Sequence, residues 1–322
     1  MKAFVPYQEA IAHFLAEKNQ HKEPRNLYEP IEYILGLGGK RLRPALVIAA
    51  ANTYGATIEE ALPAAAAIEV FHNFTLVHDD IMDDAALRRG HATVHEKWNL
   101  NTGILSGDAM LIEAYQFLET YPPELALELL KIFNKTALEV CEGQQYDVDF
   151  ETRDQVAEHE YLKMIQFKTA VLVGAALQMG ALVGGATRQD SEKLYDFGLL
   201  LGTAFQIQDD YLDAFGSSEN FGKTVGGDII ENKKTLLYIK AFERADADQK
   251  TQLQTAYSLT NTDEKITAVK NLFVATGAES VVKTAVKAYT DKALDVLNEL
   301  SLEASKKELF SAFAAELMVR NL

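Results

Sequence analysis

Residues Ile68–Thr93 read IEVFHNFTLVHDDIMDDAALRRGHAT, and this stretch decides the fold that we expect. Its apolar residues recur at the spacing of an α-helix. Between Ala61 and His78 the only acidic or basic side chain, histidines aside, is Glu69. Because so few charges are typical of a helix in a protein interior, the stretch predicts a long buried helix that ends among aspartates.

The end of this helix carries a D-D-x-x-D motif formed by Asp79, Asp80 and Asp83. Asp79 and Asp83 lie one helical turn apart on one face, where like charges repel by about 0.2–0.5 kcal/mol even on an exposed helix. Burial makes that repulsion worse, so a cation is expected to offset it. A single motif of this kind is also typical of a surface acidic patch, and His72, two turns before Asp79, is by itself consistent with a structural role.

A second D-D-x-x-D motif ends the segment Leu199–Phe215, which reads LLLGTAFQIQDDYLDAF and contains Asp209, Asp210 and Asp213. Gln206 lies three residues before Asp209 and shares its face. Two such motifs on two apolar helices predict two acidic walls that face each other across a cavity. Ligands that offer only oxygen suit a hard cation, and Mg²⁺ is the expected ion when substrate phosphates complete its octahedral shell.

Basic residues occur close to both motifs in a chain whose 31 Lys and Arg against 47 Asp and Glu give a net charge of −16. Surface Lys and Arg are usually solvated, so each basic residue alone indicates little. Arg presents a planar fork to phosphate oxygens and Lys a mobile point charge. Together with the aspartates, these residues predict a diphosphate bridged by metal on one side and bound by cations on the other. The basic residues and their neighbours are Lys40, Arg41 and Arg43 in a Gly-rich turn, Arg88 and Arg89, Lys168 with Thr169, Lys223, Lys233 and Lys234.

The rest of the chain shows helical spacing with few strand-like alternations, and no linker or repeat divides it. We therefore expect an all-α fold, a bundle of ten or more helices in a single domain over residues 1–322. The segments with helical spacing are Pro44–Tyr54, Ile58–His78, Leu105–Thr120, Leu125–Glu142, Glu192–Phe215 and Ala268 onward. The expected breaks are at Gly36–Gly39, Tyr54–Gly55, Tyr121–Pro123, Gly184–Gly185 and Gly216–Gly227.

Composition excludes several classes of protein. A surface this acidic repels nucleic acid and anionic lipid. The single cysteine, Cys141, permits no intrachain disulfide and fits a reducing compartment. The Ala- and Gly-rich segment Thr169–Thr187 is the one stretch that resembles a membrane span, but its weak hydrophobicity favours a close-packed buried helix. We expect a cytoplasmic protein with no stable membrane insertion.

Three motifs together resemble the trans-isoprenyl diphosphate synthases, the family that includes the farnesyl and geranylgeranyl diphosphate synthases. They are Gly39–Pro44, His78–Asp83 with Arg88–Gly90, and Phe205–Asp213, and they follow the order of the family. The resemblance implies the all-α isoprenoid synthase fold around a deep central cavity, a homodimer, and several Mg²⁺ ions per active site. The implied reaction is head-to-tail condensation, in which an allylic diphosphate ionises and the double bond of isopentenyl diphosphate attacks the allylic cation.

The resemblance also implies roles for residues at matching positions. The implied magnesium ligands are Asp79, Asp83 and Asp209, supported by Asp80, Asp210 and Asp213; these six with Lys168 form the implied catalytic set. The implied isopentenyl diphosphate site is Lys40, Arg43, His72 and Arg89. The implied allylic diphosphate site is Arg88, Lys168, Thr169, Gln206, Lys223 and Lys233. Gly227, Ala92 and Leu237 depart from the commoner family pattern, but none of these departures removes an implied diphosphate ligand.

Product length in this family depends on residues just before the first aspartate motif, here Phe74 and Thr75. One aromatic residue beside a small one resembles synthases of C15–C20 products, most of all those that make geranylgeranyl diphosphate. On an ideal helix Thr75 falls near the stripe of Asp79, whereas Phe74 lies about 140° around. The role of Phe74 as the floor of the chain pocket therefore rests on the resemblance, and an ordinary core aromatic is the alternative.

Four other functions compete with this hypothesis. A longer-chain synthase and a non-catalytic regulatory subunit of a heteromeric synthase stay open, although a regulatory subunit is expected to have lost aspartates. A P-loop nucleotidase needs a glycine five residues before Gly222, where the chain has Ser217. A terpene cyclase normally lacks the second D-D-x-x-D motif and the isopentenyl site.

Overall fold

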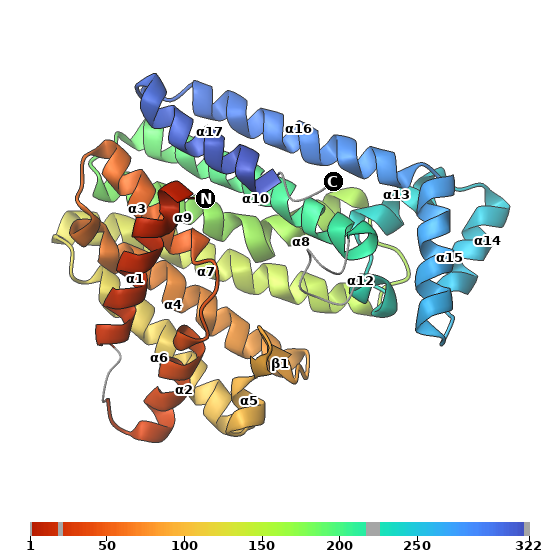
Figure 1. Ribbon diagram of the computed structural model, residues 1–322, viewed down its shortest axis with the longest axis horizontal. Coiled ribbons are helices and arrows are strands. Elements are labelled where there is room, and N and C mark those ends of the chain that lie inside the picture. Colours follow the sequence, from red (N-terminus) through yellow and green to blue (C-terminus); the bar gives the residue numbers. More distant parts are fainter. Residues whose placement is uncertain (1, 19–21, 217–225, 319–322) are drawn as a thin grey trace. The chain divides into compact units, whose positions relative to one another are not determined.

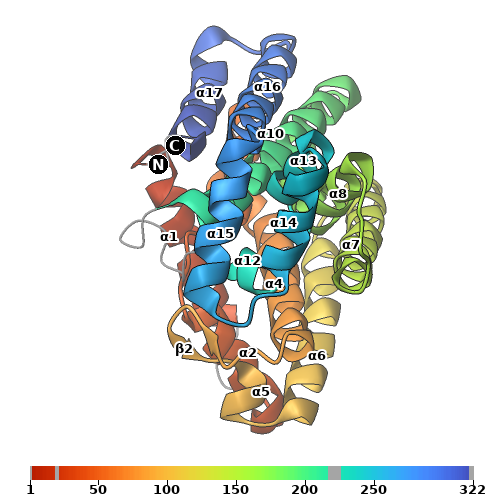
Figure 2. The same cartoon turned by 90° about the vertical axis from the view of Figure 1, so that its right-hand side faces the viewer.

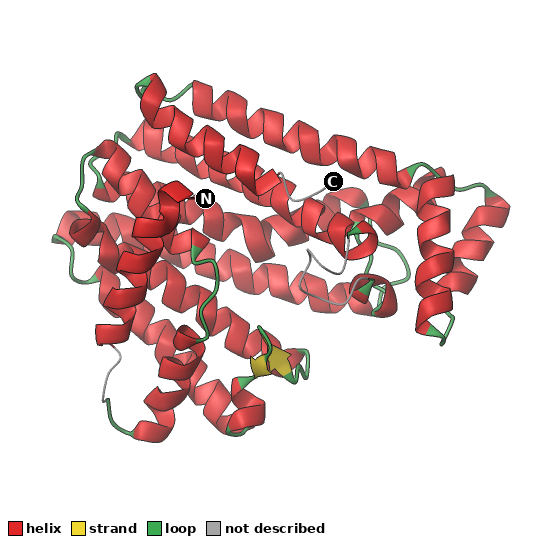
Figure 3. Ribbon diagram, in the orientation of Figure 1, coloured by secondary structure: helices red, strands yellow, loops and turns green. Residues whose placement is uncertain are grey.

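The computed structural model describes residues 2–18, 22–216 and 226–318, which are helical almost throughout (Figures 1 and 3). The chain forms two compact units, one of Met1–Lys135 with Ala175–Tyr195 and the other of Thr136–Gly174 with Asp196–Leu322. The predicted all-α class is confirmed, since the described strands are two of two residues each. The prediction of a single domain over residues 1–322 stays a prediction.

The first unit contains the first aspartate motif. Its elements are the 3₁₀ turn η1 (Lys2–Phe4), α1 (Val5–Lys18), α2 (Arg25–Gly36), α3 (Leu42–Tyr54), α4 (Ile58–Met82), β1 (Leu87–Arg88), β2 (His91–Ala92), α5 (Val94–Lys97) and α6 (Leu100–Leu118). Three further helices have residues in both units: α7 (Pro123–Glu151), α9 (Val171–Val183) and α10 (Arg188–Phe215).

Helix α4 is the central helix of the first unit. It begins with a capping box, in which the Glu60 amide donates to Thr57 Oγ1 at 3.3 Å and the Thr57 amide donates to Glu60 Oε2 at 2.7 Å. Its middle is buried, as the charge-poor sequence predicts. Helix α6 packs closely on it, because a Cβ atom at Gly103 would lie 2.9 Å from Ile81 and one at Gly107 would overlap His78. Small residues on α6 therefore fix the end of α4 that carries the aspartates.

The Ala- and Gly-rich segment is a close-packed helix, as predicted. A Cβ atom at Gly180 of α9, or at Gly184 just after this helix, would overlap the main-chain oxygen of Val47 or Ala51 in α3. The one described helix long and apolar enough to cross a membrane is Glu158–Val183, and 61% of its most apolar window is buried inside the structure. Burial of this kind is typical of a core helix.

The second unit contains the second aspartate motif. Its remaining elements are α8 (Glu158–Ile165), the π-helical turn η2 (Gln166–Ala170), α12 (Gly227–Ile230), α13 (Leu236–Arg244), α14 (Ala247–Tyr257), α15 (Thr262–Ala275), α16 (Ala278–Asn298) and α17 (Ala304–Met318). Figure 2 shows α14 and α15 side by side, and α16 and α17 also pair. A core around Tyr161, Ile207 and Phe273 joins α8, α10 and α15.

The predicted ends at Tyr54 and Phe215 and the predicted start at Ile58 agree with the structure, whereas α6 begins five residues before Leu105 and α7 continues nine residues past Glu142. Most of the predicted break at Gly216–Gly227 lies outside the described residues. Helix α4 runs four residues past His78 and includes Asp79 and Asp80. The stretch from Ala268 onward is divided among the end of α15, α16 and α17. Gly277, which adopts a positive φ, separates α15 from α16. Arg43 lies inside the first turn of α3, whereas the sequence placed it just before a helix.

Candidate active site

The first aspartate motif occupies the C-terminal end of α4. The last turn reads Asp79-Asp80-Ile81-Met82, and Asp83 caps the helix by donating its amide to Asp79 O at 2.8 Å. The C-terminus of a helix carries a partial negative charge that favours cations and disfavours carboxylates. Three carboxylates at this position, with no basic residue in the last turn, create a strongly negative local potential that a cation would stabilise.

Arg88 offsets part of this negative charge. Its Nε and Nη2 both donate to Asp80 Oδ1, at 2.9 and 2.5 Å, and Asp80 is 1% exposed. Asp80 Oδ2 is buried without a hydrogen-bond partner in the part of the chain that the structure describes. Arg88 therefore neutralises the buried member of the motif, and acceptor capacity remains on that carboxylate.

The arginine hairpin, formed by β1 and β2, touches the Gly-rich turn before α3. Arg89 Nη1 donates to Gly38 O. A Cβ atom at Gly39 would lie 2.7 Å from Arg89 Cζ, and the φ of +120° at Gly39 is one that L side chains rarely adopt. Glycine is therefore required at this position, and the contact brings Arg89 beside the loop of Lys40.

Arg43 and His72 also meet, with Arg43 Nη1 and His72 Nε2 3.4 Å apart. Burial, together with the positive charges of Arg43, Arg89 and Arg88, holds the pKa of His72 well below its ordinary value. The imidazole is therefore neutral near pH 7, and its Nε2 can accept a hydrogen bond from Arg43. The structure thus brings together Arg43, His72 and Arg89 of the predicted isopentenyl diphosphate site and places Lys40 on an adjoining loop.

Glu69 lies among these basic residues and was not predicted as part of the site. It is 5% exposed and accepts a hydrogen bond from Asn73 Nδ2 at 3.2 Å. Burial raises the pKa of Glu69, whereas the charges of Arg41, Arg43 and Arg89 and the bond from Asn73 lower it. In the sequence, Glu69 stood out only as the single charged residue in the middle of a buried helix. The structure explains why a charge is tolerated there: Glu69 is a counter-charge to the nearby arginines.

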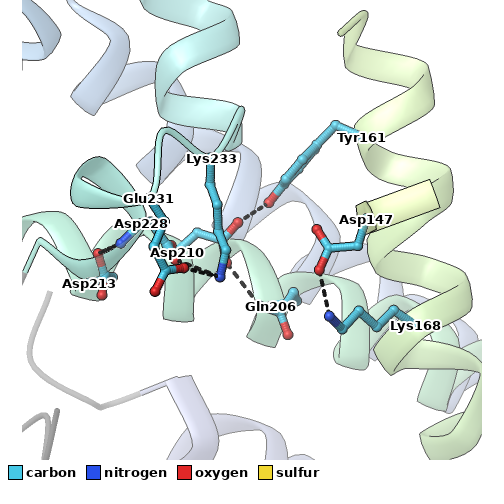
Figure 4. Close-up of polar contacts among 9 residues, drawn as sticks. All are labelled: Asp147, Tyr161, Lys168, Gln206, Asp210, Asp213, Asp228, Glu231 and Lys233. Carbon is cyan, nitrogen blue, oxygen red and sulfur yellow. Dashed lines mark hydrogen bonds and ion pairs between the residues drawn. The ribbon is translucent and has the colours of Figure 1, made fainter. Parts of the chain in front are cut away.

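The second aspartate motif lies in the last two turns of α10, again with no basic residue in the last turn. Asp210 accepts hydrogen bonds from Tyr161 Oη at 2.6 Å and from Gln206 Nε2 at 2.9 Å (Figure 4). Burial and the nearby Asp228 carboxylate raise the pKa of Asp210 to about 8, although both hydrogen bonds lower it. This carboxylate is thus held by uncharged donors.

Asp213 and Lys233 are bound to the segment around α12. The Asp228 amide donates to Asp213 Oδ2 at 3.0 Å, and Lys233 Nζ lies 3.6 Å from Asp228 Oδ1 and 2.9 Å from Glu231 Oε2 (Figure 4). Burial lowers the pKa of Lys233, but the two carboxylates raise it above its ordinary value. Lys233 is therefore a cation. Lys223 lies outside the described residues.

Lys168 and Thr169 lie in the π-helical turn η2, an element that is frequent at functional sites. Lys168 Nζ donates to Asp147 Oδ2 at 2.5 Å (Figure 4). Thr169 Oγ1 donates to Gln206 Oε1 at 3.1 Å. Because Gln206 also donates to Asp210, a continuous hydrogen-bonded chain links Thr169 to the aspartate motif.

Two glycines allow these contacts. A Cβ atom at Gly143 of α7 would overlap the Lys168 backbone, and one at Gly202 of α10 would lie 2.8 Å from Ala170 Cα. Asp147 and Gln206 each follow one of these glycines by four residues, one helical turn. Close helix contact on both sides of η2 therefore brings the two polar side chains within reach of it.

Phe74 and Thr75 are both on α4. The Phe74 ring centroid lies 5.6 Å from that of Phe71 and 4.8 Å from that of His78. Thr75 Oγ1 donates to His72 O at 2.8 Å within the same helix. Phe74 is thus packed between two rings and is only partly buried.

Comparison with known proteins identifies the family. The family profile described as Polyprenyl synthetase matches residues 24–275. The chain belongs to the polyprenyl synthetase family. It is 46% identical over 223 residues to a geranylgeranyl diphosphate synthase of Methanosarcina mazei, covering 69% of each chain. It is 41% identical over 258 residues to a geranylfarnesyl diphosphate synthase of Natronomonas pharaonis, covering 74% of this chain and 75% of that one. A crystal structure of a geranylgeranyl pyrophosphate synthase matches with a TM-score of 0.95 and 52% identity over 99% of both chains.

The family resemblance predicted from three motifs is thereby confirmed. The motifs all lie within the matched residues, but several partners of the site residues gave no sequence signal. Tyr161 and Asp147 carry no motif, and they reach Asp210 and Lys168 from 49 and 21 residues away. Asp228 stands in the loop noted for departing from the family pattern, which is the one signal that could have drawn attention to it.

Proposed function

We propose that this short-chain prenyl diphosphate synthase makes geranylgeranyl diphosphate by condensing isopentenyl diphosphate with an allylic diphosphate. The enzyme class follows from the family and from relatives with 46–52% identity that are named geranylgeranyl diphosphate or pyrophosphate synthases. The observation that carries the reaction is the pair of aspartate motifs, each at the C-terminal end of a helix whose last turn has no basic residue. Both ends favour bound cations.

The carboxylates fit magnesium, because they offer only oxygen atoms and one of them retains a buried acceptor without a hydrogen bond among the described residues. Asp79, Asp83 and Asp209 are the proposed ligands, with Asp80, Asp210 and Asp213 in support. The ions would neutralise the charge that develops on the departing diphosphate. We propose that both motifs serve the same allylic diphosphate.

Basic side chains complete the proposed allylic diphosphate site. Arg88, Lys168 and Lys233 each have a carboxylate partner that holds the side chain in place. Thr169 and Gln206 are joined by a hydrogen bond, so their polar atoms are already ordered. Donors that are fixed before the substrate binds stabilise the leaving group without the cost of reorganisation.

Isopentenyl diphosphate is proposed to bind to Lys40, Arg43, His72 and Arg89. The contacts between Arg43 and His72 and between Arg89 and the Gly38 loop gather these donors in one region of the first unit. In the reaction, the allylic C–O bond breaks, the isopentenyl double bond forms the new C–C bond, and loss of a proton restores an alkene. Walls without water protect the allylic cation in the meantime.

We also propose that the enzyme works as a cytoplasmic homodimer. Leu100, Ile104, Leu105 and Ile112 on α6, with Leu127 on α7, are each at least 40% exposed and belong to the first unit. Leu100, Ile104 and Ile112 recur at multiples of four residues and therefore share one exposed face of α6. An exposed apolar face marks an interaction surface. The family resemblance names a second copy of the chain as the partner.

A product assay tests the function. Purified protein is incubated with Mg²⁺, labelled isopentenyl diphosphate and farnesyl diphosphate, and the dephosphorylated products are sized. A C20 product is expected. A C25 product would match the activity that names the Natronomonas pharaonis relative and would replace the proposed product without changing the chemistry. Absence of any product from farnesyl, geranyl and dimethylallyl primers would favour the regulatory subunit.

A further inference from the structure

Three metal-binding side chains lie together beside the first aspartate motif without belonging to it. Asp84, His95 and Glu96 each offer one ligand atom, and these atoms all lie within 4.8 Å of one another. Asp84 precedes β1, whereas His95 and Glu96 lie on α5 just after β2, so the three residues flank the arginine hairpin in the chain. Figures 1 and 2 show the hairpin next to α5. Both carboxylates are exposed, so an ion can reach them from solvent.

His95 is the residue that points to a ligand. Its side chain is only 9% exposed, and neither ring nitrogen has a hydrogen-bond partner among the described residues. Nε2 faces Glu96 Oε1 at 3.8 Å, which is beyond hydrogen-bonding distance. An imidazole always has a donor or an acceptor on each nitrogen, and leaving both unused in a buried position is unfavourable. The ring is therefore held toward two carboxylates without bonding either.

We propose that Asp84, His95 and Glu96 bind one divalent transition-metal ion such as Zn²⁺. An ion placed among three atoms no more than 4.8 Å apart can lie within about 2.8 Å of each, and shifts of less than about 1 Å bring them to the 2.0–2.2 Å of Zn–N and Zn–O bonds. Two carboxylates balance the charge of the ion. Three protein ligands with a fourth position open to water is a common zinc arrangement.

The donor set separates this site from the aspartate motifs. Asp79, Asp80 and Asp83 offer oxygen alone, the ligand of Mg²⁺, whereas an imidazole nitrogen favours Zn²⁺, Co²⁺ or Ni²⁺. Excess Mg²⁺ should therefore occupy the aspartate motifs and leave the histidine site for a transition metal. The assignment does not depend on the reaction that the enzyme catalyses.

The ion would join the two ends of the segment 84–96, which carries Arg88 and Arg89. In the structure, Thr93 already joins these ends by two hydrogen bonds: its Oγ1 donates to Ala85 O at 2.7 Å, and its amide donates to Ala86 O at 3.1 Å. A metal bridge from Asp84 to α5 adds a second closure to the same loop. Bound metal is therefore expected to raise the melting temperature and to slow proteolysis within the hairpin.

The experiment titrates the full-length protein with Co²⁺ in excess Mg²⁺ and follows the visible absorption of Co²⁺. One equivalent is expected to bind to the unaltered protein. H95Q and E96Q should weaken binding by more than about 100-fold, because even residues behind a metal ligand contribute about 10- to 100-fold. Equal binding by H95Q, or no uptake by the unaltered protein, would overturn the proposal.

Two controls make the outcome specific. His91→Gln removes an exposed histidine of the same hairpin and should leave Co²⁺ binding unchanged. Asp79→Asn should also retain it, and loss of binding in Asp79→Asn but not in H95Q would assign the ion to the aspartate motif instead. E96Q changes an exposed side chain and preserves the fold, so it decides the matter if H95Q does not fold.

Discussion

The two aspartate motifs have the same spacing but different charge compensation. In the first unit the buried member, Asp80, is bound by the guanidinium of Arg88. In the second unit the corresponding residue, Asp210, accepts hydrogen bonds from the uncharged side chains of Tyr161 and Gln206, and its pKa is raised to about 8. The first motif is thus partly neutralised by a nearby arginine of the protein, whereas the second depends more on a bound metal ion for its positive charge.

This difference shows why the motif alone does not define the chemistry of each half. The Asp80 carboxylate has a guanidinium as its partner, whereas burial and the neighbouring Asp228 carboxylate raise the pKa of Asp210. The C-terminal ends of α4 and α10 add the same negative potential in both cases. The contrast between the motifs therefore lies in the residues around them, and variants can measure it.

The largest effect is expected from Asp79→Ala and Asp209→Ala. Each removes a proposed magnesium ligand, and each should lower kcat/KM by more than about 10³-fold, since losing even one donor to developing charge costs about 10²- to 10³-fold. Steady-state assays and circular dichroism measure activity and fold. Glu119→Ala and Asp295→Ala, two exposed carboxylates from the first and second units, should retain activity. Near-normal turnover in both motif variants would contradict the proposal that both halves act.

Arg88→Gln and Tyr161→Phe compare the two kinds of compensation directly. Arg88→Gln leaves the buried Asp80 charge unpaired and should lower the free energy of unfolding by about 3 kcal/mol. Tyr161→Phe removes one hydrogen bond to Asp210 and should cost about 1–2 kcal/mol. Urea unfolding without Mg²⁺ measures both.

The double variant Asp80→Asn with Arg88→Gln is the matched control for the ion pair. It removes both charges, so most of the lost stability should return. If the double variant were as unstable as Arg88→Gln alone, the loss would come from packing and not from an unpaired carboxylate.

The contacts that set this contrast could not be predicted from the sequence, although the motifs could. Asp79 and Asp209 are recognisable because each belongs to a D-D-x-x-D motif within a single helix. The charge-poor stretch before Asp79 predicts that α4 is buried. The partners Tyr161 and Asp147 act across 49 and 21 residues, and no local periodicity encodes such distances. Gly143 lies one turn before Asp147, and Gly202 lies one turn before Gln206. These spacings become informative only once the structure shows that both glycines pack against the turn η2.

The raised pKa of Asp210 predicts a contribution to the stability of the metal-free protein that declines as the pH rises. The folded state keeps this proton up to about pH 8, whereas an unfolded chain releases it near the ordinary Asp value of 3.8. At Asp210 the folded state therefore binds more protons between these limits, so the contribution of this group to stability falls across that window. The lowered pKa of His72 acts in the opposite direction, because the unfolded chain gives up its histidine proton as the pH rises through the ordinary value. Urea unfolding at pH 5 and pH 8 in the presence of a chelator measures the slope.

Asp210→Asn is the control for this pH dependence. It carries no titratable proton, so the decline between pH 5 and pH 8 should become shallower, and added Mg²⁺ should have the same effect on the unaltered protein by binding the folded state. An unchanged slope in Asp210→Asn would assign the dependence to another group and would remove the difference between the two motifs.

The smallest change in catalysis, but the clearest change in product, is expected from Phe74→Ala. Phe74 precedes Asp79 by five residues in α4, whereas α10 has Ala204 at the corresponding place and Phe205 one residue later. If the floor of the chain pocket belongs to α4, Phe74→Ala should lengthen the product beyond C20 and change turnover by less than about tenfold, since the aspartates and their partners are untouched. Phe205→Ala should leave the product length unchanged. Chromatography of dephosphorylated products measures both, and a C20 product from Phe74→Ala would make Phe74 an ordinary core aromatic between Phe71 and His78.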